Sequence, residues 1–456
     1  MKGMSKRDVV TLGLLVLTSV FLFADQNIIN PVIEDIVREY GVDREQIGLL
    51  GSAFFVLGAL ISLLFGFLTD KYSRKVLFAV VVLVGEIPCL LTGFELFTQT
   101  YEQLLVLRVL TGIGVGGIFP LTFSMLGDYF RPEHRPVANA WIGVAWAIGQ
   151  VLGQTLAGFL VEDYGWRLPF LLIAAPNFVL VPLFLAVARE PKRGQCEDSL
   201  KELIDAGGEY AKRISLAEVG LIFKNRTNLL SFLQGITGCI PWGVLPFFLI
   251  DFYRTQKGFP VSIATTLTLV FGIGATLGGL FGGFIGERLY KRSPGLVPIS
   301  VGASILVGTL PWFLLLGLEF PAAPTWSSFP LPALVGFLAG AVVTYPSPNV
   351  KAVLMNVNPP ERRGSTFAVF NLTDSVGKGI GPFIGGVLIT SIGYAEAMAV
   401  SVAFWIPTGI VYLLIARTFQ RDIDRLDAYL RARADELRAQ PREPAPGEDA
   451  SGPALA

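Results

Sequence analysis

Long apolar stretches separated by short charged segments dominate this chain of 456 residues. A helix that crosses a membrane needs about 20 largely apolar residues, and twelve stretches reach that length. They lie at roughly 9–30, 47–69, 76–95, 104–127, 136–161, 168–188, 228–252, 262–286, 295–318, 330–355, 364–390 and 395–416. The pattern predicts an all-α polytopic membrane protein with twelve transmembrane helices.

The distribution of basic residues predicts the orientation of these helices. With alternating sides, 28 of the 36 Lys and Arg residues fall on the side of the chain termini and five on the other side. Cytoplasmic segments carry such an excess, so both termini are expected in the cytoplasm. The first stretch has a basic start like a signal peptide, but it lacks a small-residue cleavage site. We therefore expect it to be retained as a helix.

Composition excludes several classes of function. Hydrophobic residues make up 52% of the chain and charged residues only 16%, against roughly 25% charged in soluble proteins. The formal net charge is zero, so nothing indicates a nucleic-acid partner. Three distant cysteines and one histidine do not supply a disulfide framework, a metal site or a catalytic triad. A Walker A sequence is also missing, so we expect neither an enzyme nor a cofactor.

The chain repeats itself. The Pro-Glu pair at 132–133 recurs at 360–361, an offset of 228, and the glycines at 149, 153 and 158 recur at the same offset. Parallel repeats of this kind place a solute site between two halves of a transporter. We expect a six-helix bundle at 1–188, a cytoplasmic linker at 189–227, a second bundle at 228–417 and a cytoplasmic tail at 418–456. The tail has helical amphipathic spacing to about 440 and a Pro- and Gly-rich end, for which we expect disorder.

The linker allows two interpretations. Its apolar residues have the spacing of an amphipathic helix on the membrane surface, and its charge also suits a solvated tether.

A charged motif follows the second apolar stretch: Gly66, Asp70, Lys71, Arg74 and Lys75. It resembles the signature loop of the major facilitator superfamily. Its counterpart in the second half, at an offset of 217, consists of Gly283, Glu287, Arg288, Lys291 and Arg292. Arg108 followed by Thr-Gly-Ile-Gly resembles that family's helix 4 motif, and the Asp25-Gln26-Asn27 region resembles the Spinster-like branch. The resemblance implies a transporter that works by alternating access.

The loop charges suggest a conformational latch. Asp70 lies at a helix end where Arg74 and Lys75 can reach it, and such a cluster can hold one conformation and release it in another. The alternative is that these basic residues only set the topology.

Closely spaced glycines suggest close helix crossings on the fifth and eleventh stretches. These crossings could form a hinge or seam that controls leak, or they could serve helix packing alone. The residues are Gly149, Gly153, Gly377, Gly381, Pro382, Gly385 and Gly386.

Charged residues inside apolar stretches are the sharpest functional signal. Each costs roughly 2.5–3.5 kcal/mol at the centre of a lipid-facing helix. The six are Asp25, Glu86, Arg108, Lys351, Asp374 and Lys378. Three acids and three bases suggest that they face a paired or aqueous interior. Lys351 lies near a helix end and can instead snorkel to the interface. Glu86 lies on the third helix, which is peripheral in the resembled family.

Two pairings follow from these positions. Asp25 and Arg108 can pair across the first bundle, as a proton or substrate site or as a structural pair. Asp374 and Lys378 are four residues apart on one helical face, so they can neutralise each other, or Lys378 can attract an anion. Further candidates for the cavity are aromatic and amide residues, each of which could instead be packing glue: Gln26, Asn27, Trp146, Gln150, Trp242, Tyr345, Asn349 and Asn371.

The sequence therefore predicts a monomeric secondary active transporter in the lipid bilayer of a bacterial inner membrane. The expected partners are a small organic or amphipathic solute, of anionic character, and a proton. One alternative is a drug-type proton antiporter that exports lipophilic cations. Another is a membrane sensor that keeps the transporter fold without transporting.

Overall fold

The structure, a computed structural model, describes residues 6–69, 72–129, 135–190, 220, 222–321, 323–358 and 360–439. Over these ranges it contains helices and no strand. Twelve of the described helical segments are long and apolar enough to cross a membrane. The predicted all-α class and the twelve spans are therefore confirmed.

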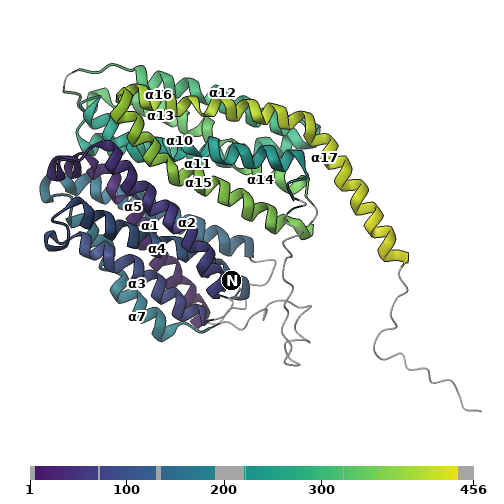
Figure 1. The fold of residues 1–456 in the computed structure, drawn as a ribbon, viewed down its shortest axis with the longest axis horizontal. Helices are drawn as coiled ribbons and strands as arrows, with labels where there is room; N and C mark the ends of the chain where they lie inside the picture. The colour runs from purple at the N-terminus through teal and green to yellow at the C-terminus, as the bar shows by residue number, and fades with distance from the viewer. Residues whose placement is uncertain are drawn as a thin grey trace, which may run out of the picture.

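The first seven helices form one group, here called the N-terminal bundle (Figure 1). Within it α1 packs on α5, and α4 packs on both α2 and α3. The sixth span is divided into α6 and α7 around Pro176, whose missing N–H interrupts helical hydrogen bonding. The elements are α1 (Lys6–Tyr40), α2 (Arg44–Thr69), α3 (Arg74–Thr92), η1 (Glu95–Phe97), α4 (Tyr101–Tyr129), α5 (Arg135–Tyr164), α6 (Leu168–Ala174) and α7 (Asn177–Val187).

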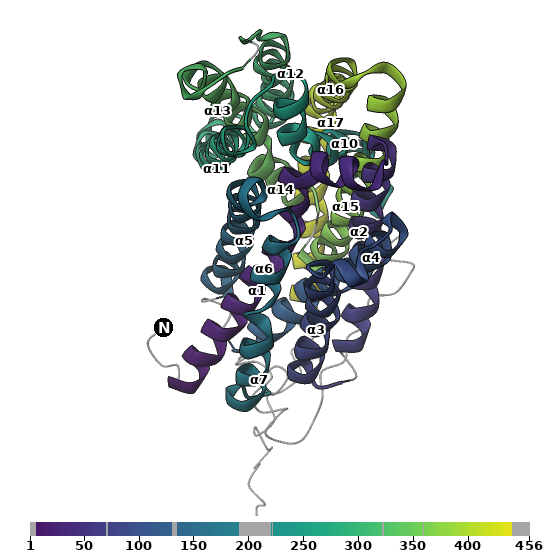
Figure 2. The same ribbon diagram turned by 90° about the vertical axis from the view of Figure 1, so that its left-hand side faces the viewer.

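The remaining helices form the C-terminal bundle (Figures 1 and 2). The tenth span of the chain is divided where Pro346 begins a new helix, and the twelfth span is divided at Phe404. The elements are α10 (Arg226–Thr255), α11 (Val261–Arg292), α12 (Leu296–Gly317), η4 (Trp326–Ser328), α13 (Pro330–Thr344), α14 (Pro346–Asn356), α15 (Pro360–Ile392), α16 (Tyr394–Ala403) and α17 (Trp405–Ala439).

Helix α17 continues well past the bundle, as Figure 1 shows in yellow. Its extension is tied to α10 by Asp422, which is buried and accepts hydrogen bonds from the backbone N and Oγ1 of Thr227 (3.2 and 2.7 Å). An acidic group at this helix N-terminus satisfies free N–H groups and the helix dipole. The expected helical tail is thus present through Ala439. Residues 440–456 and most of the linker (191–219 and 221) lie outside the described residues.

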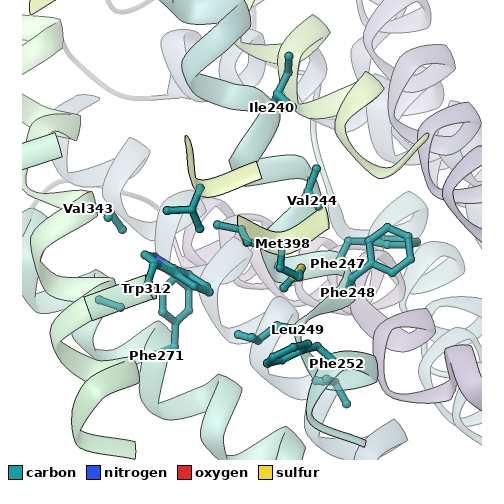
Figure 3. Packing of buried hydrophobic residues seen from close by; sticks show 14 of the residues in the cluster. Ile240, Val244, Phe247, Phe248, Leu249, Phe252, Phe271, Trp312, Val343 and Met398 are labelled. Carbon is teal, nitrogen blue, oxygen red and sulfur yellow. The ribbon is translucent and has the colours of Figure 1, made fainter. Parts of the chain in front are cut away.

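Aromatic side chains fill the interior of the C-terminal bundle (Figure 3). Trp312 is fully buried and stacks edge-on against Phe271 with ring centroids 5.4 Å apart. Trp405 joins the same cluster, 6.2 Å from Trp312. Edge-to-face contacts of this kind stabilise beyond area burial alone.

Small residues let helices cross closely at the sites that the sequence singled out. On α15, a Cβ at Gly381 would lie 2.6 Å from the Gly243 Cα of α10, which leaves no room for a side chain. Gly149 and Gly153 of α5 approach the α1 backbone, and Gly377 and Gly385 approach α10 in the same way. Pro382 and Gly386 lie against α2. These positions pack both within and between the bundles.

Candidate functional site

The two bundles are joined at one end by ion pairs. We call this the outer end; it is where α1 ends at Tyr40. Arg44 of α2 contacts Asp251 of α10 (3.2 Å) and Glu34 of α1 (2.5 Å). Asp251 also accepts from the Tyr394 hydroxyl at 2.7 Å. Asp251 is almost fully buried. Breaking this pair would leave a buried charge unpaired, which costs more than breaking an exposed pair.

A second bridge lies beside the first. Arg254 of α10 donates to Asp35 (2.9 Å) and to the Pro31 carbonyl (2.7 Å), both on α1. Deeper along the helices, the Oγ of Ser52 on α2 accepts a hydrogen bond from the backbone N–H of Phe383 on α15 at 2.8 Å. Further hydrogen bonds join the bundles here through Asn30 and Glu162. These contacts hold the bundles together at the outer end.

The predicted pair in the N-terminal bundle is formed. Arg108 Nη1 donates to Asp25 Oδ1 at 2.6 Å, and Nη2 donates to the Asp25 carbonyl at 3.2 Å. Their side chains are 1% and 0% exposed. The guanidinium also lies over the rings of Phe54 (4.8 Å) and Phe170 (5.5 Å), favourable contacts for a cation. Arg108 is thus enclosed within its own bundle and is not accessible to a solute in this conformation.

Lys378 has a different environment. It is exposed and forms no ion pair or hydrogen bond with any described residue. Asp374, one turn earlier, lies in the electrostatic field of both Lys378 and Lys351 but makes no ion pair within 4.0 Å in the described chain. The expected neutralising pair is therefore not formed here. Two lysines around one carboxylate leave this cluster with a net charge of +1.

Helix geometry places Lys378 on the face of α15 between its contacts with α10 and α2. Residues on a helix advance by about 100° each. On α15, Gly377 and Gly381 face α10, whereas Pro382 and Gly386 face α2. Lys378 lies between these two directions, and so do Asn371 and Asp374. The three polar residues thus form a stripe directed between α10 and α2.

The same geometry applies to α5 on the opposite side. Gly149 and Gly153 face α1, and Gly158 faces Thr265 of α11 in the other bundle. Trp146 and Gln150 lie between these directions, and Trp146 is 46% exposed. Gln150 Nε2 donates to Gln26 Oε1 of α1. These side chains supply an amide and aromatic surface between the faces of α5 that meet α1 and α11.

Residues of α1 continue this surface toward the outer seal. Asn27 is half-buried and its Oδ1 accepts from Asn30 at 3.4 Å. Asn30 also donates to the Pro246 carbonyl of α10 at 3.3 Å. The α1 amides therefore include Asn30, which joins the two bundles through its hydrogen bond to α10.

Three other candidates make their contacts within the C-terminal bundle. Tyr345 donates to Ser300 Oγ of α12 (2.8 Å), and Asn349 donates to the Gly282 carbonyl of α11 (2.9 Å). Both bonds are inside the C-terminal bundle. Trp242 is half-buried and packs on Trp405 with centroids 5.8 Å apart. These contacts favour the packing role that the sequence left open for Tyr345 and Asn349.

Comparison with known proteins assigns this architecture. The family model described as Major Facilitator Superfamily matches residues 15–347. The chain belongs to the major facilitator superfamily. It is 25% identical to the probable sulfoacetate transporter of Cupriavidus necator over 68% of this chain and 71% of that protein. It is 26% identical to the probable 4-methylmuconolactone transporter of Cupriavidus pinatubonensis over 82% of each.

A solved structure supports the fold. The inward-facing, unoccupied crystal structure of a bacterial homologue of the human lysosomal transporter Spinster superposes with a TM-score of 0.76. It is 20% identical and covers 92% of this chain and 99% of that one. The predicted resemblance to the superfamily and to its Spinster-like members is confirmed, and the chain is a transporter by family rather than an enzyme.

The superfamily loop motif has a partner that the sequence did not reveal. Glu190, just after α7, accepts from Ser73 Oγ (2.6 Å), from the backbone N–H groups of Arg74 and Lys75 (3.0 and 2.9 Å) and from Arg74 Nε (3.2 Å). Burial opposes ionisation of Glu190, but these hydrogen bonds outweigh it and lower its pKa. The carboxylate thus caps α3 and anchors the loop motif to the end of the bundle.

The remaining parts of the two loop motifs differ in what the structure describes. Asp70 and Lys71, with their expected contacts, lie outside the described residues, and Gly66 lies on α2. In the second half Glu287 pairs with Lys291 at 2.5 Å as an exposed i,i+4 pair. Gly283, Arg288 and Arg292 lie on the same end of α11. Exposed pairs of this kind contribute little to stability.

Proposed function

We propose that this protein is a proton-coupled transporter of small organic anions that works by alternating access. The observation that carries the proposal is the net charge of +1 around Asp374, with Lys378 directed between the bundles and unpaired in the described chain. A cation in a partly dry cavity favours an anionic solute strongly. A lipophilic cation would be repelled by this site.

Two further observations support the solute class. Sulfoacetate and 4-methylmuconolactone, named for the two bacterial relatives, are both small polar organic compounds with acidic groups. The facing surface of Trp146, Gln150 and Gln26 offers an aromatic ring and amide groups, which suit the organic part of such a solute. We place the anion between Lys378 and this surface.

Coupling to protons is supported by the opposite bundle. Asp25, Glu86 and Arg108 are all buried, two acids against one base. A dry cluster with excess acid binds a proton to reach neutrality. The bundles would then take up opposite charges, an anion in one and a proton in the other. By its fold and its bacterial relatives we assign the protein to a bacterial inner membrane.

Alternating access is supported by the bridges at the outer end. The ion pairs of Arg44 and Arg254 join the two bundles there. For release to the other side these bridges must break and the inner ends must meet.

The test is uptake into proteoliposomes of labelled organic anions, with a lipophilic cation for comparison. Lys378→Ala removes one charge-assisted contact and should weaken anion affinity roughly 10- to 100-fold. The control is Lys224→Ala, which removes the same charge from an exposed position near the N-terminus of α10. Cation uptake in place of anion uptake, or an unchanged Lys378→Ala affinity, would contradict the proposal.

A further inference from the structure

Glu86 is a buried carboxyl group inside the N-terminal bundle and is not part of the proposed anion site. It lies on α3 with 0% exposure. Its Oε1 accepts from Asn177 Nδ2 of α7 at 2.5 Å, and its Oε2 has no partner among the described residues. No cation pairs with it in the described chain. An ionised carboxylate in such a place is very costly.

The neighbours of Glu86 add negative charge. Asp25 of α1 is close enough to act on it electrostatically. Arg108 of α4 is the cation of the cluster, and it donates two hydrogen bonds to Asp25. Cys89, one turn along α3, is a neutral thiol that donates to the Phe170 carbonyl at 3.8 Å. With both acids ionised the cluster would carry a net charge of −1 in a dry interior.

The other elements packed on α3 do not change this balance. Helices α6 and α7 contain no titratable residue, and α2 contains only Arg44 and Glu45, both at its outer start, where Arg44 is paired with Glu34 and Asp251. Glu95 of η1 lies at the outer end of α3. One proton therefore neutralises the cluster, and it can reside on either acid.

The contacts decide between the two acids. Asp25 receives a charge-assisted bond of 2.6 Å from Arg108, whereas Glu86 receives only a bond from a neutral amide. We propose that Glu86 is the proton-binding site of the N-terminal bundle and carries its proton while Asp25 stays ionised against Arg108. The charge state follows from the cluster alone, and its part in coupling rests on the proposed function.

Unpaired polar atoms around Glu86 suit transfer of this proton. Within the described residues, Thr18 Oγ1, Asn177 Oδ1, Asp25 Oδ2 and Arg108 Nε are buried without hydrogen-bond partners. When Arg108 withdraws from Asp25, the proton can pass from Glu86 Oε2 to Asp25. Glu86 is then the anion and Asp25 the acid, so the total charge of the cluster is unchanged.

Infrared spectroscopy of the purified full chain at neutral pH tests the charge state. A protonated carboxylic acid has a C=O absorption that a carboxylate lacks. We expect the wild type to show this band and Glu86→Gln to lose it. The control is Glu396→Gln, which removes an exposed carboxylate and should leave the band in place.

A band that persists unchanged in Glu86→Gln would overturn the proposal. If this variant does not fold, Glu86→Asp keeps a carboxyl group at the site and should shift the frequency of the band. If the band in Glu86→Asp had the same frequency as in the wild type, the proposal would also be overturned.

Transport separates this inference from the proposed function. In proteoliposomes, an inward proton gradient should stimulate anion uptake by the wild type, and Glu86→Gln should lose that stimulation. Wild-type protein that moved no organic anion would refute the proposed function but leave the infrared result standing. Full gradient stimulation in Glu86→Gln would refute the coupling role of Glu86 alone.

Discussion

Charged clusters of opposite balance lie in the two bundles, and the partners of each charge decide what it can do. Arg108 is committed to Asp25 with both side chains almost fully buried, so it holds the N-terminal bundle together and keeps one acid ionised. Lys378 is exposed and unpaired in the described chain, so it is the cation that a solute can reach. At the scale of single residues, burial and pairing therefore distinguish Arg108, a structural residue, from Lys378, the proposed binding residue.

The buried pair gives the first prediction. Arg108→Gln leaves the Asp25 carboxylate without its counter-charge, and we expect a loss of about 3–5 kcal/mol in the free energy of unfolding. The double variant Asp25→Asn/Arg108→Gln should melt at a higher temperature than Arg108→Gln, because no unpaired charge remains. The measurement is the thermal melting temperature of purified protein. Lys291→Gln, which breaks an exposed pair, is the control and should melt as the wild type does.

At the scale of elements, both bundles anchor a helix end with a carboxylate from beyond their last span. Glu190 caps α3 after α7, and Asp422 caps α10 from the extension of α17. The repeated arrangement fixes the inner ends of helices on which the loop motif depends. It also shows that the chain beyond each sixth span belongs to the bundle's structure.

The Glu190 cap predicts a dependence on pH. The bonds from Ser73 and α3 outweigh burial and lower the pKa of Glu190. Its stabilisation is therefore fully present above the ordinary pKa of about 4.3 and is lost as pH falls through the lower folded value. Glu190→Gln should weaken the α3 cap by about 0.5–1 kcal/mol at neutral pH, a modest value because the site is partly exposed.

Hydrogen exchange of the first α3 amides measures this effect. The difference between wild type and Glu190→Gln should be constant at neutral pH and should vanish in acid. Asp424→Asn, an exposed carboxylate on α17, is the control and should leave α3 exchange unchanged. A difference that grew as pH fell would contradict the cap.

The sequence predicted those features that depend on local pattern. Run lengths predicted the twelve spans, and spacing placed Asp25 opposite Arg108. Glu190 was missed because its partners lie more than a hundred residues away, and nothing in the local pattern marks a carboxylate as a cap. The sequence left open whether Tyr345 lines a cavity or packs, because spacing along one helix does not show which neighbouring helix a face meets. The pair of Arg44 and Asp251 was missed, because pairing between two bundles leaves no regular spacing in the sequence.

At the scale of the whole molecule, the bundles are held at the outer end by a few bridges. Arg44–Asp251 and Arg254–Asp35 join α2 and α1 to α10. Arg167, by contrast, pairs with Glu39 inside the N-terminal bundle. Only the first two bridges must break when the outer end opens, so the two kinds of ion pair should affect the conformational equilibrium differently.

This difference gives the last prediction. Arg254→Gln removes one bridge, and if that bridge contributes about 1.4 kcal/mol the outer-open population rises about tenfold. Spin labels at Glu102 and Glu396, exposed residues near the outer end of each bundle, report the distance across the seal by pulsed electron resonance. We expect a longer-distance population in Arg254→Gln and more of it when Asp251→Asn is added. Arg167→Gln removes the same charge without touching the seal and should keep the wild-type distances. If Arg167→Gln widened the distribution as much as Arg254→Gln did, charge loss in general, rather than the bridges between the bundles, would control the outer end.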